Sequence, residues 1–485
     1  MAERSESLGR RVFSGGITML FTQGMTIVLY FLAQRVILST LTKEENGELF
    51  AVRRVADLIL ILLVDFGLNG VSMRRVIQQP EHAREILSST LAFKLMMWVV
   101  ATLLCFGYAQ FAHLSIVDVV LWCLFLLLTS RSGMLRYTME LPYRAHVRFG
   151  FVNGLAILDA VIFVGLVMLW KDALTPSTVI VAYMCSTLPG FFTLLVMDKG
   201  RNFRPRWVST ATMKSLVVDA LPVLVLVILT NIHDKIDGMM LERFSTPREM
   251  GIFSAAYQTL VPLTGTIPMA ITMSLVPAVA HLAKENWEEC RRFALTGLRI
   301  IVLAGIAVST VTSAAAPFII DVVSKGRYSD NLIHFVTFLW MPLPIFILVF
   351  VQELMVAMGH QRRALPIAIS LAVTTVATGL VLIPEWNAYG AVLSKLAAVG
   401  VSSIVSYVLL HRVLGESLTL SAPFRIVIVT AVCCAVAVMA PEHLGIALGT
   451  LLSAVVFVVM AVVTGLITRA DVGMVRRLLQ SRASA

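Results

Sequence analysis

The chain has 485 residues, of which 58% are hydrophobic and only 14% are charged, and its mean hydropathy is +0.86. This composition excludes an ordinary soluble domain, because apolar runs of about 18 or more residues, long enough to cross a hydrocarbon core of about 30 Å, recur throughout. The net charge of +10 does not indicate nucleic-acid binding, since Lys and Arg gather in alternate short loops and form no basic stripe interleaved with aromatic residues. The sequence therefore predicts an all-α polytopic membrane protein.

The apolar runs predict about fourteen transmembrane helices joined by short loops. They cover residues 13–38, 49–73, 86–110, 115–139, 149–170, 177–197, 214–240, 251–280, 292–320, 332–358, 364–383, 387–411, 423–440 and 443–468. The first run is too long for the apolar core of a signal peptide and lacks a small-residue cleavage site, so we expect it to be a retained helix. None of the loops is long enough to build an extramembrane domain.

The basic residues of the loops predict an orientation. Most of them lie in the two tails and in the loops after every second predicted helix, whereas the opposite loops hold only Lys43, Lys171, Arg243, Arg248, Lys325 and Arg327. Positive charge marks cytoplasmic loops, so we expect both termini in the cytoplasm, which agrees with an even number of helices.

An internal repeat follows from a motif that occurs twice. The pattern T-x-x-E-x-G occupies residues 42–47 after the first predicted helix and residues 246–251 after the seventh. Threonine at this position caps a following helix, and glycine permits close approach or positive φ. The repeat predicts two parallel six-helix lobes, residues 1–200 and 201–412, followed by two additional helices and a cytoplasmic tail in residues 413–485.

The most unusual stretch of the sequence is residues 221–242, which begins as an apolar helix and then becomes strongly polar. Within seven residues it places Asn231, His233, Asp234, Lys235 and Asp237. A charge near the bilayer interior costs several kcal/mol, so this cluster should face protein or a water-filled cavity. We interpret Lys235 as a cavity cation, while Asp234 and Asp237 either compensate it or bind a coupling cation.

Further charges lie on the first two predicted helices. Arg35 lies about one turn inside the outer end of the first helix, and the repeat relates it to Met239, one turn from Lys235. On the second helix, Arg53 and Arg54 are four and three residues before Asp57, so either can meet that carboxylate. The arginines could present guanidinium groups to an anionic head group, with Asp57 as an orienting or ion-coupling carboxylate. Arg53 and Arg54 could equally fix packing or extend to the interface, whereas we interpret Arg35, like Lys235, as a cavity cation.

Other charged residues in the apolar runs receive less specific expectations. Lys94, Arg299 and Asp219 lie near cytoplasmic helix ends, where long side chains extend to the interface. Asp65 is expected to make a structural bond to a neighbouring helix or loop. Asp159 lies near the middle of a run, and the sequence does not name its partner.

Several familiar chemistries are absent from the sequence. It contains no G-x-x-x-x-G-K-[ST], no H-E-x-x-H, no G-x-S-x-G and no C-x-x-C or Cys/His metal spacing. We therefore expect no catalytic residues, no metal and no cofactor, and a protein that is not an enzyme.

Five segments resemble a known family: T-K-E-E-N-G-E-L-F-A, L-V-D-F-G-L-N-G, S-K-G-R-Y-S-D-N, V-A-M-G-H-Q-R-R and L-I-P-E-W-N-A-Y-G-A-V-L-S-K. The chain resembles the oligosaccharide and polysaccharide flippases of the MOP superfamily, whose relatives are lipid II flippases and MATE exporters. The resemblance implies two six-helix lobes, a central cationic cavity, alternating access and transfer of undecaprenyl-diphosphate-linked glycans. Arg35, Arg53, Arg54 and Lys235 are the residues that could match its cavity cations. The two additional helices resemble those of fourteen-helix lipid II flippases.

The leading hypothesis is thus a flippase for lipid-linked oligosaccharide in the bacterial inner membrane, acting in surface polysaccharide assembly. Its expected partners are the lipid-linked glycan, membrane lipids and the polymerase or glycosyltransferase machinery. The alternative is a MATE-like ion-coupled drug or cation antiporter, which would favour an acidic cavity. A membrane polymerase or ligase ranks last, because such enzymes need a large outward-facing loop.

Overall fold

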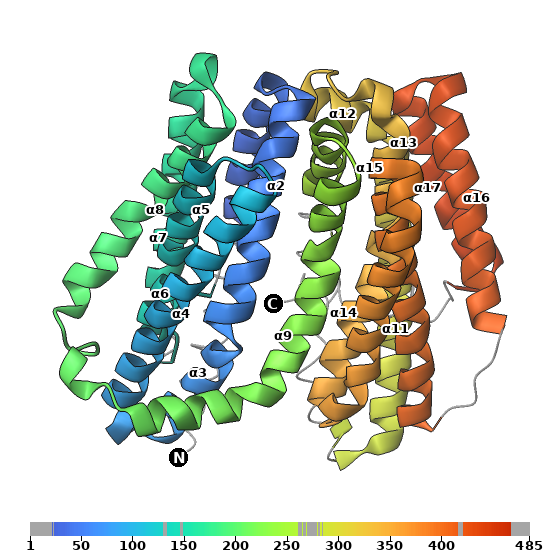
Figure 1. The fold of residues 1–485 in the computed structure, drawn as a ribbon. Helices are drawn as coiled ribbons and strands as arrows, with labels where there is room; N and C mark the ends of the chain where they lie inside the picture. Colours follow the sequence, from blue (N-terminus) through green and yellow to red (C-terminus); the bar gives the residue numbers. More distant parts are fainter. Residues whose placement is uncertain are drawn as a thin grey trace, which may run out of the picture. The chain divides into compact units, whose positions relative to one another are not determined.

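The computed structural model describes residues 22, 24–129, 133–145, 149–259, 264, 268, 279, 282–283, 285–415 and 421–466. These residues form helices and connecting turns without a strand (Figure 1). By length and composition, eight of the described helices can cross a membrane, or nine when one bent pair is counted as a single span. The predicted all-α membrane class is therefore confirmed. The number fourteen stays a prediction, and most of the predicted helix 251–280 lies outside the described residues.

The helices group into two compact units. The first comprises Met1–Ala255 and Leu371–Lys395, and the second comprises Ala256–Ser370 and Leu396–Ala485. The long helical segment α15 contributes to both units. The lobes predicted from the repeat, 1–200, 201–412 and 413–485, remain a prediction about internal symmetry.

The first unit contains a helix over Gly24–Thr40, short helical turns, and eight longer helices that Figure 1 labels. Their bounds are α2 Lys43–Leu60, α3 Leu68–Gln78, α4 Ala83–Phe111, α5 Ile116–Leu128, α6 Leu135–Ala145, α7 Phe149–Leu169, α8 Pro176–Asp198 and α9 Thr210–Phe244. The turns are the π-helix η1 Ile61–Asp65 and the 3-10 helices η2 Pro80–His82, η3 Lys171–Ala173 and η4 Pro205–Trp207.

The second predicted helix is broken in its middle. After α2 and the π-helix η1, Phe66 and Gly67 both adopt left-handed backbone angles, with φ of 49° and 75°, before α3 begins. A Cβ at position 67 would lie 2.9 Å from Val223 on α9, so glycine also permits a close approach there. The expectation of one continuous helix over 49–73 is wrong. The length of an apolar run shows that it can cross a membrane, but it does not show whether the helix is continuous.

The fourth predicted helix is also divided, into α5 and α6. Buried polar groups form hydrogen bonds with the backbone between these two helices. The Lys94 ammonium on α4 donates to the Gly133 carbonyl at 2.6 Å and to the Asn69 side chain at 2.5 Å. It lies 3.8 Å from Asp65 and its side chain is fully buried. The expectation that Lys94 extends to the interface is wrong, since an interrupted helix leaves carbonyl groups that need donors. The expected structural bond of Asp65 to a neighbouring helix is confirmed.

A second buried ion pair supplies the partner of Asp159. Arg136 on α6 contacts the Asp159 carboxylate on α7 at 2.6 Å and the Glu140 carboxylate at 3.4 Å. A Cβ at Gly190 of α8 would lie 2.6 Å from the Arg136 guanidinium. The pair therefore joins α6 and α7 against α8, and it belongs to the interior of the helix bundle.

Helix α9 bends by 53° between the segments Thr210–Leu221 and Val223–Phe244. The first segment packs its Leu216 and Ala220 into a cluster with residues of α3, α4 and α6. Asp219 does not simply extend to the interface as expected, because Arg75 of α3 contacts its carboxylate at 2.5 Å. The second segment carries the polar stretch described above.

The two copies of the repeated motif meet each other within the first unit. A Cβ added to Gly47 would lie 1.7 Å from the carbonyl oxygen of Pro247, and one added to Gly251 would lie 1.8 Å from that of Lys43. Lys43 and Pro247 occupy equivalent positions in the repeat. The two contacts are therefore equivalent and related by the repeat. Each glycine thus allows one helix start to touch the backbone of the other.

Threonine caps both of these helix starts. Thr42 forms a capping box with Glu45 at the start of α2. In the second copy, the Glu249 N–H donates to the Thr246 hydroxyl at 3.4 Å. Both structures follow the expectation that threonine at this position caps the next helix.

The segment α15, Leu365–Leu414, is a helical hairpin. Asn387 has φ 48° and ψ −125°, which reverses the chain. The hydroxyls of Thr378 and Ser394 lie 2.8 Å apart, and a straight helix would separate residues sixteen positions apart by about 24 Å. The two limbs agree with the separate helices 364–383 and 387–411 that the sequence predicts.

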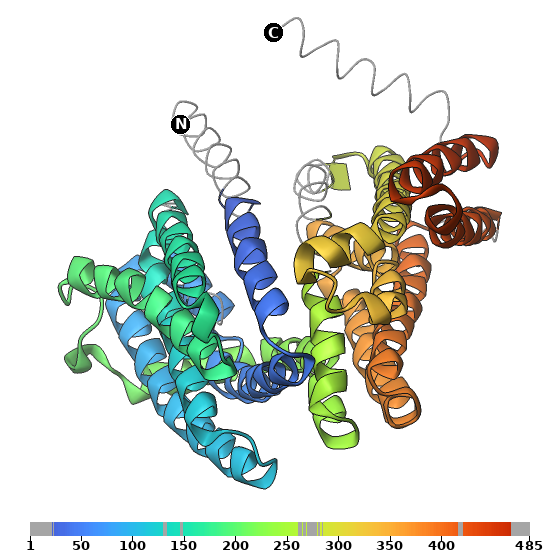
Figure 2. The same ribbon diagram turned by 90° about the horizontal axis from the view of Figure 1, so that it is seen from above.

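Apart from α15, the other helices that Figure 1 labels belong to the second unit. Their bounds are α11 Trp287–Ala314, α12 Ala316–Ser324, α13 Leu332–Phe338, α14 Pro342–Ala357, α16 Ser421–Leu444 and α17 Ile446–Val463, with 3-10 turns η5 Ser329–Asn331 and η6 Gln361–Ala364. The predicted spans 292–320 and 332–358 are each divided, by the turns between α11 and α12 and between α13 and α14. Figure 2 shows α16 and α17 as a neighbouring pair in red, and α11 contacts both of them.

Candidate functional site

The polar stretch of α9 forms a charge network with α2. The Lys235 ammonium lies 2.8 Å from the Asp234 carboxylate and 3.4 Å from the Asp57 carboxylate. The other oxygen of Asp57 accepts a hydrogen bond of 2.9 Å from the Trp122 indole on α5. Three helices of the first unit are therefore joined at Asp57, and two carboxylates contact the one lysine.

Arg54 reaches the same part of α9 from α2. Its guanidinium donates to the Asp234 backbone carbonyl at 2.8 Å and lies 3.8 Å from the Asp234 carboxylate. The residue is only 3% exposed, and its charge lies 4.6 Å from the centre of the Phe50 ring. A Cβ at Gly238 would lie 2.5 Å from the Arg54 stem, so the glycine leaves the space through which this side chain passes.

Lys395, on the second limb of the α15 hairpin, completes the network and was not among the residues assigned to the site from sequence. Its ammonium lies 3.1 Å from the Asp237 carboxylate and donates to the His233 backbone carbonyl at 2.9 Å. Both Lys395 and Asp237 are 1% exposed. The sequence shows a charge at each position, but nothing in its spacing links two helices so far apart in the chain.

Among the described residues, the ion pairs of the network join equal numbers of cations and carboxylates. The cations Arg54, Lys235 and Lys395 contact the carboxylates of Asp57, Asp234 and Asp237. A charge can be buried when a partner and hydrogen bonds replace its water. Of the two alternatives left open from sequence, Asp234 has Lys235 as its counter-ion in this structure, whereas Asp237 has Lys395.

The other two predicted cations lie differently. The Arg53 guanidinium lies 5.1 Å from the centre of the Trp122 ring and 5.6 Å from that of Tyr183, which places it beside the Asp57 end of the network. Arg35 is exposed and makes no hydrogen bond or ion pair with any described residue. The structure therefore brings together Arg54, Lys235 and, through Trp122, Arg53, but it does not bring Arg35 to them.

One further hydrogen bond fixes α9 against the hairpin. The His233 ring nitrogen Nδ1 lies 2.7 Å from the Thr375 hydroxyl on the first limb of α15. Within the described part of the chain, no group of His, Cys, Asp and Glu side chains has an arrangement that could hold a metal ion. The network is thus an assembly of ion pairs and hydrogen bonds from four helical segments.

The fold and the charges within its apolar helices define the class of this protein, which is a multi-pass membrane protein with a transporter fold. A solved structure of the lipid II flippase MurJ in an inward closed conformation matches with a TM-score of 0.71 at 8% identity, covering 93% of this chain and 98% of that one. An inward-facing MATE multidrug transporter matches with a TM-score of 0.63 at 15% identity, covering 80% and 94%. A MOP superfamily transporter from Pyrococcus furiosus matches with 0.59 at 12%, covering 82% and 94%. These similarities establish a MurJ- and MATE-like fold.

The family follows from the sequence itself. Residues 8–283, more than half of the chain, match the family described as polysaccharide biosynthesis protein, and the chain belongs to that family. A search of curated proteins gives no match. The resemblance to MOP superfamily flippases drawn from short motifs is confirmed.

Proposed function

We propose that this protein is a flippase that moves undecaprenyl-diphosphate-linked oligosaccharide across the bacterial inner membrane for surface polysaccharide assembly, by alternating access. The observation that carries the proposal is the family match over residues 8–283, which includes the whole α2 and α9 part of the charge network. The fold shared with a lipid II flippase supports a lipid-linked cargo. Both termini would lie in the cytoplasm, and polymerase or glycosyltransferase enzymes would supply or consume the cargo.

The network suggests how a diphosphate head group would be bound and released. Lys235 is the partly exposed cation of the network, and it already contacts two carboxylates. A diphosphate would compete with Asp57 and Asp234 for this ammonium, and Arg53 at the Trp122 ring would supply a second charge. After transfer, the carboxylates would re-form their ion pairs and favour release. Binding by exchange of partners keeps the head group from being held too tightly.

Arg54 and Lys395 have a different role in this proposal. Both are almost fully buried, and each donates to a backbone carbonyl of α9. They hold the α9 backbone in place so that Lys235 and Asp234 are presented together. We therefore assign cargo contact to Lys235 and Arg53 and a positioning role to Arg54 and Lys395.

An ion-coupled antiporter of the MATE type is the second candidate, since the network holds carboxylates that could bind a cation. An antiporter of this type would favour a net acidic cavity. In the described network three cations offset the three carboxylates, and this favours the flippase. The Lys395 ammonium also lies within 3.1 Å of Asp237, where it already acts as the counter-ion.

The test is a complementation experiment in a strain that lacks the protein. We expect inward-facing lipid-linked glycan to accumulate in this strain and the wild-type protein to restore polymer export. Lys235→Ala should abolish export while the protein remains inserted in the membrane. Lys214→Ala is the matched control, because Lys214 is exposed on the same helix and outside the network.

Two results would contradict the proposal at different levels. Unchanged polymer export and unchanged lipid-linked intermediates in the strain without the protein would exclude the flippase function itself. Wild-type export by Lys235→Ala would leave the function in place and reduce the network to a packing role.

A further inference from the structure

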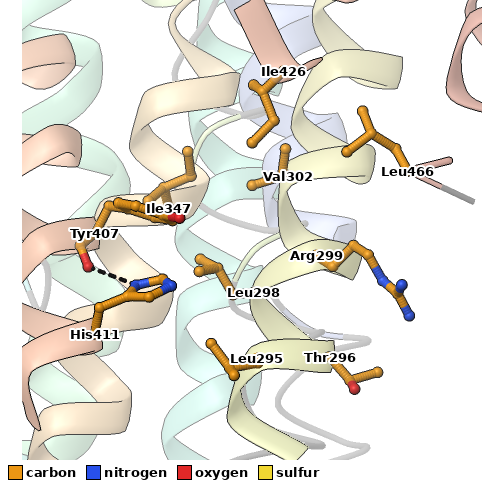
Figure 3. Close-up of a pocket in the computed structure, with 10 residues that line it drawn as sticks. All are labelled: Leu295, Thr296, Leu298, Arg299, Val302, Ile347, Tyr407, His411, Ile426 and Leu466. Atoms are coloured by element: carbon orange, nitrogen blue, oxygen red, sulfur yellow. Dashed lines mark hydrogen bonds between the residues drawn. The ribbon is translucent and has the colours of Figure 1, made fainter. Parts of the chain in front are cut away.

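The second unit contains an apolar cavity with a volume of about 340 Å³. Its walls come from α11, α14, α15, α16 and the turn that follows α17 (Figure 3). The apolar part of the wall includes Leu298, Val302, Ile347 and Ile426, and none of the described residues that line the cavity is acidic. The cavity has no part in the charge network, whose residues all belong to the first unit.

The cavity lies at the ends of several helices. His411 is one turn before the last residue of α15, Ile426 is in the second turn of α16, and Leu466 follows the end of α17. At about 1.5 Å per residue, each of these positions is within about 8 Å of a helix end. These three positions correspond to the boundary between hydrocarbon and lipid head groups, on the side predicted to face the cytoplasm, whereas the lining residues of α11 lie about 12–23 Å from its first residue.

A cation lies on the stripe of α11 that lines the cavity. At about 100° per residue, Arg299 is near the centre of that stripe, between Leu298 on one flank and Thr296 on the other. Figure 3 shows its guanidinium extending from α11 away from Tyr407 and His411. Arg425, next to the lining residue Ile426, is exposed. Apolar walls with one arginine among the lining residues, and a second arginine next to a lining residue, match an amphiphile with a negatively charged head.

The opposite wall is an ordered aromatic surface. The His411 ring lies 4.1 Å from the Tyr407 ring, and its Nδ1 is 3.0 Å from the Tyr407 backbone carbonyl. His411 is buried, so it contributes a fixed flat surface against which a chain can pack.

We propose that this cavity binds an anionic phospholipid of the surrounding membrane. One acyl chain packs among Leu298, Val302 and Ile426, and the phosphate contacts Arg299 with Arg425 nearby. The apolar lining offers few partners for sugar hydroxyls, and the volume is near the lower limit of about 300 Å³ for ligand cavities, which suits a chain segment better than a glycan. The proposal does not depend on the cargo, because the ligand is a component of the bilayer.

The bound lipid would attach α16 and α17 to the rest of the second unit. Only 22% and 17% of the most apolar windows of α16 and α17 are buried within the protein, against 50% for α11. These two helices pack on each other and on α11, and most of their remaining apolar surface lies outside the protein interior. A lipid held between α11, α15 and α16 would add further contacts between α16 and the rest of the second unit.

The experiment uses the purified full-length protein and native mass spectrometry with added phosphatidylglycerol or phosphatidylcholine of identical acyl chains. We expect preferential binding of phosphatidylglycerol. Arg299→Gln should weaken this binding about fivefold, the effect of one basic residue at a membrane surface. Arg292→Gln is the matched control, because Arg292 is an exposed arginine of α11 that does not line the cavity. Val302→Phe, which fills the cavity and keeps every charge, should reduce binding of both lipids.

Three results would overturn the proposal. Equal binding of the two lipids would show that the head-group charge is not recognised. Equal weakening by Arg299→Gln and Arg292→Gln would indicate diffuse attraction rather than a site. Displacement of phosphatidylglycerol by undecaprenyl diphosphate, with both lost in Val302→Phe, would assign the cavity to the cargo lipid. Restored binding in Arg299→Lys would show that the loss in Arg299→Gln reflects charge and not misfolding.

Discussion

At the scale of single residues, the Lys395–Asp237 pair shows why a buried charge needs its partner. Both side chains are 1% exposed, and Lys395 also donates to the His233 carbonyl. Replacing one member leaves the other charged and without its counter-ion in a dry interior. We expect Lys395→Met to cost about 3–5 kcal/mol of unfolding free energy, measured by denaturation in detergent micelles.

The double variant is the control for this prediction. Lys395→Met combined with Asp237→Asn removes both charges and keeps an oxygen for the Gly238 N–H, which donates to Asp237 at 2.8 Å. Most of the lost stability should therefore return. If the double variant is as unstable as Lys395→Met alone, the loss comes from packing and not from an uncompensated carboxylate.

The site could be predicted from sequence only where its contacts are local. The polar stretch of α9 and the arginines of α2 are visible because charges interrupt apolar runs. The spacing of Arg53, Arg54 and Asp57 identifies neighbours on one helix, yet Asp57 contacts Lys235 and Trp122 on two other helices. Lys395 was missed for the same reason, since pairing across distant helices is set by the fold.

At the scale of elements, the repeated motif makes a contact that depends on two glycines. A Cβ at Gly47 would lie 1.7 Å from the Pro247 carbonyl oxygen, so Gly47→Ala must push the two helix starts apart. We expect a loss of about 1–3 kcal/mol, the usual cost of overpacking, and a lower melting temperature in detergent. Gly251→Ala, whose Cβ would lie 1.8 Å from the Lys43 carbonyl oxygen, should have a similar effect.

For a helical glycine without close neighbours, we expect that substitution by alanine does not destabilise the protein. A Cβ at Gly165 of α7 would have nothing within 4 Å. Gly165→Ala should therefore be neutral or stabilise the protein by about 0.5–1 kcal/mol, because alanine has the higher helix propensity. Equal melting temperatures for Gly47→Ala and Gly165→Ala would show that the helix starts can separate at no cost.

Hydropathy predicted the helices better than their continuity. The α2–α3 segment stays mostly apolar across its break, so a sliding average does not detect it, whereas the predicted span 115–139 runs across the polar stretch T-S-R-S-G at residues 129–133 between α5 and α6. Lys94 and Asn69, which form the hydrogen bonds at the break between α5 and α6, lie on other helical segments. The local sequence at the break therefore does not reveal them. By contrast, the T-x-x-E-x-G motif predicted a real helix start twice, because capping is a local interaction.

At the scale of the whole molecule, the distribution of basic residues predicts the topology. The segment around Lys171 is expected outside and the basic segment 199–206 inside, with α8 crossing the membrane between them. Alkaline phosphatase is active only where its disulfides form, outside the cytoplasm. Fusions at Asp172 and at Tyr328 should therefore be active, and fusions at Gly200, at Arg362 and after Ala485 inactive. An active fusion after Ala485 would place the C-terminus outside. With the N-terminus in the cytoplasm, this would require an odd number of crossings and contradict the prediction of fourteen helices. It would also contradict the assignment of the lipid cavity to the cytoplasmic side.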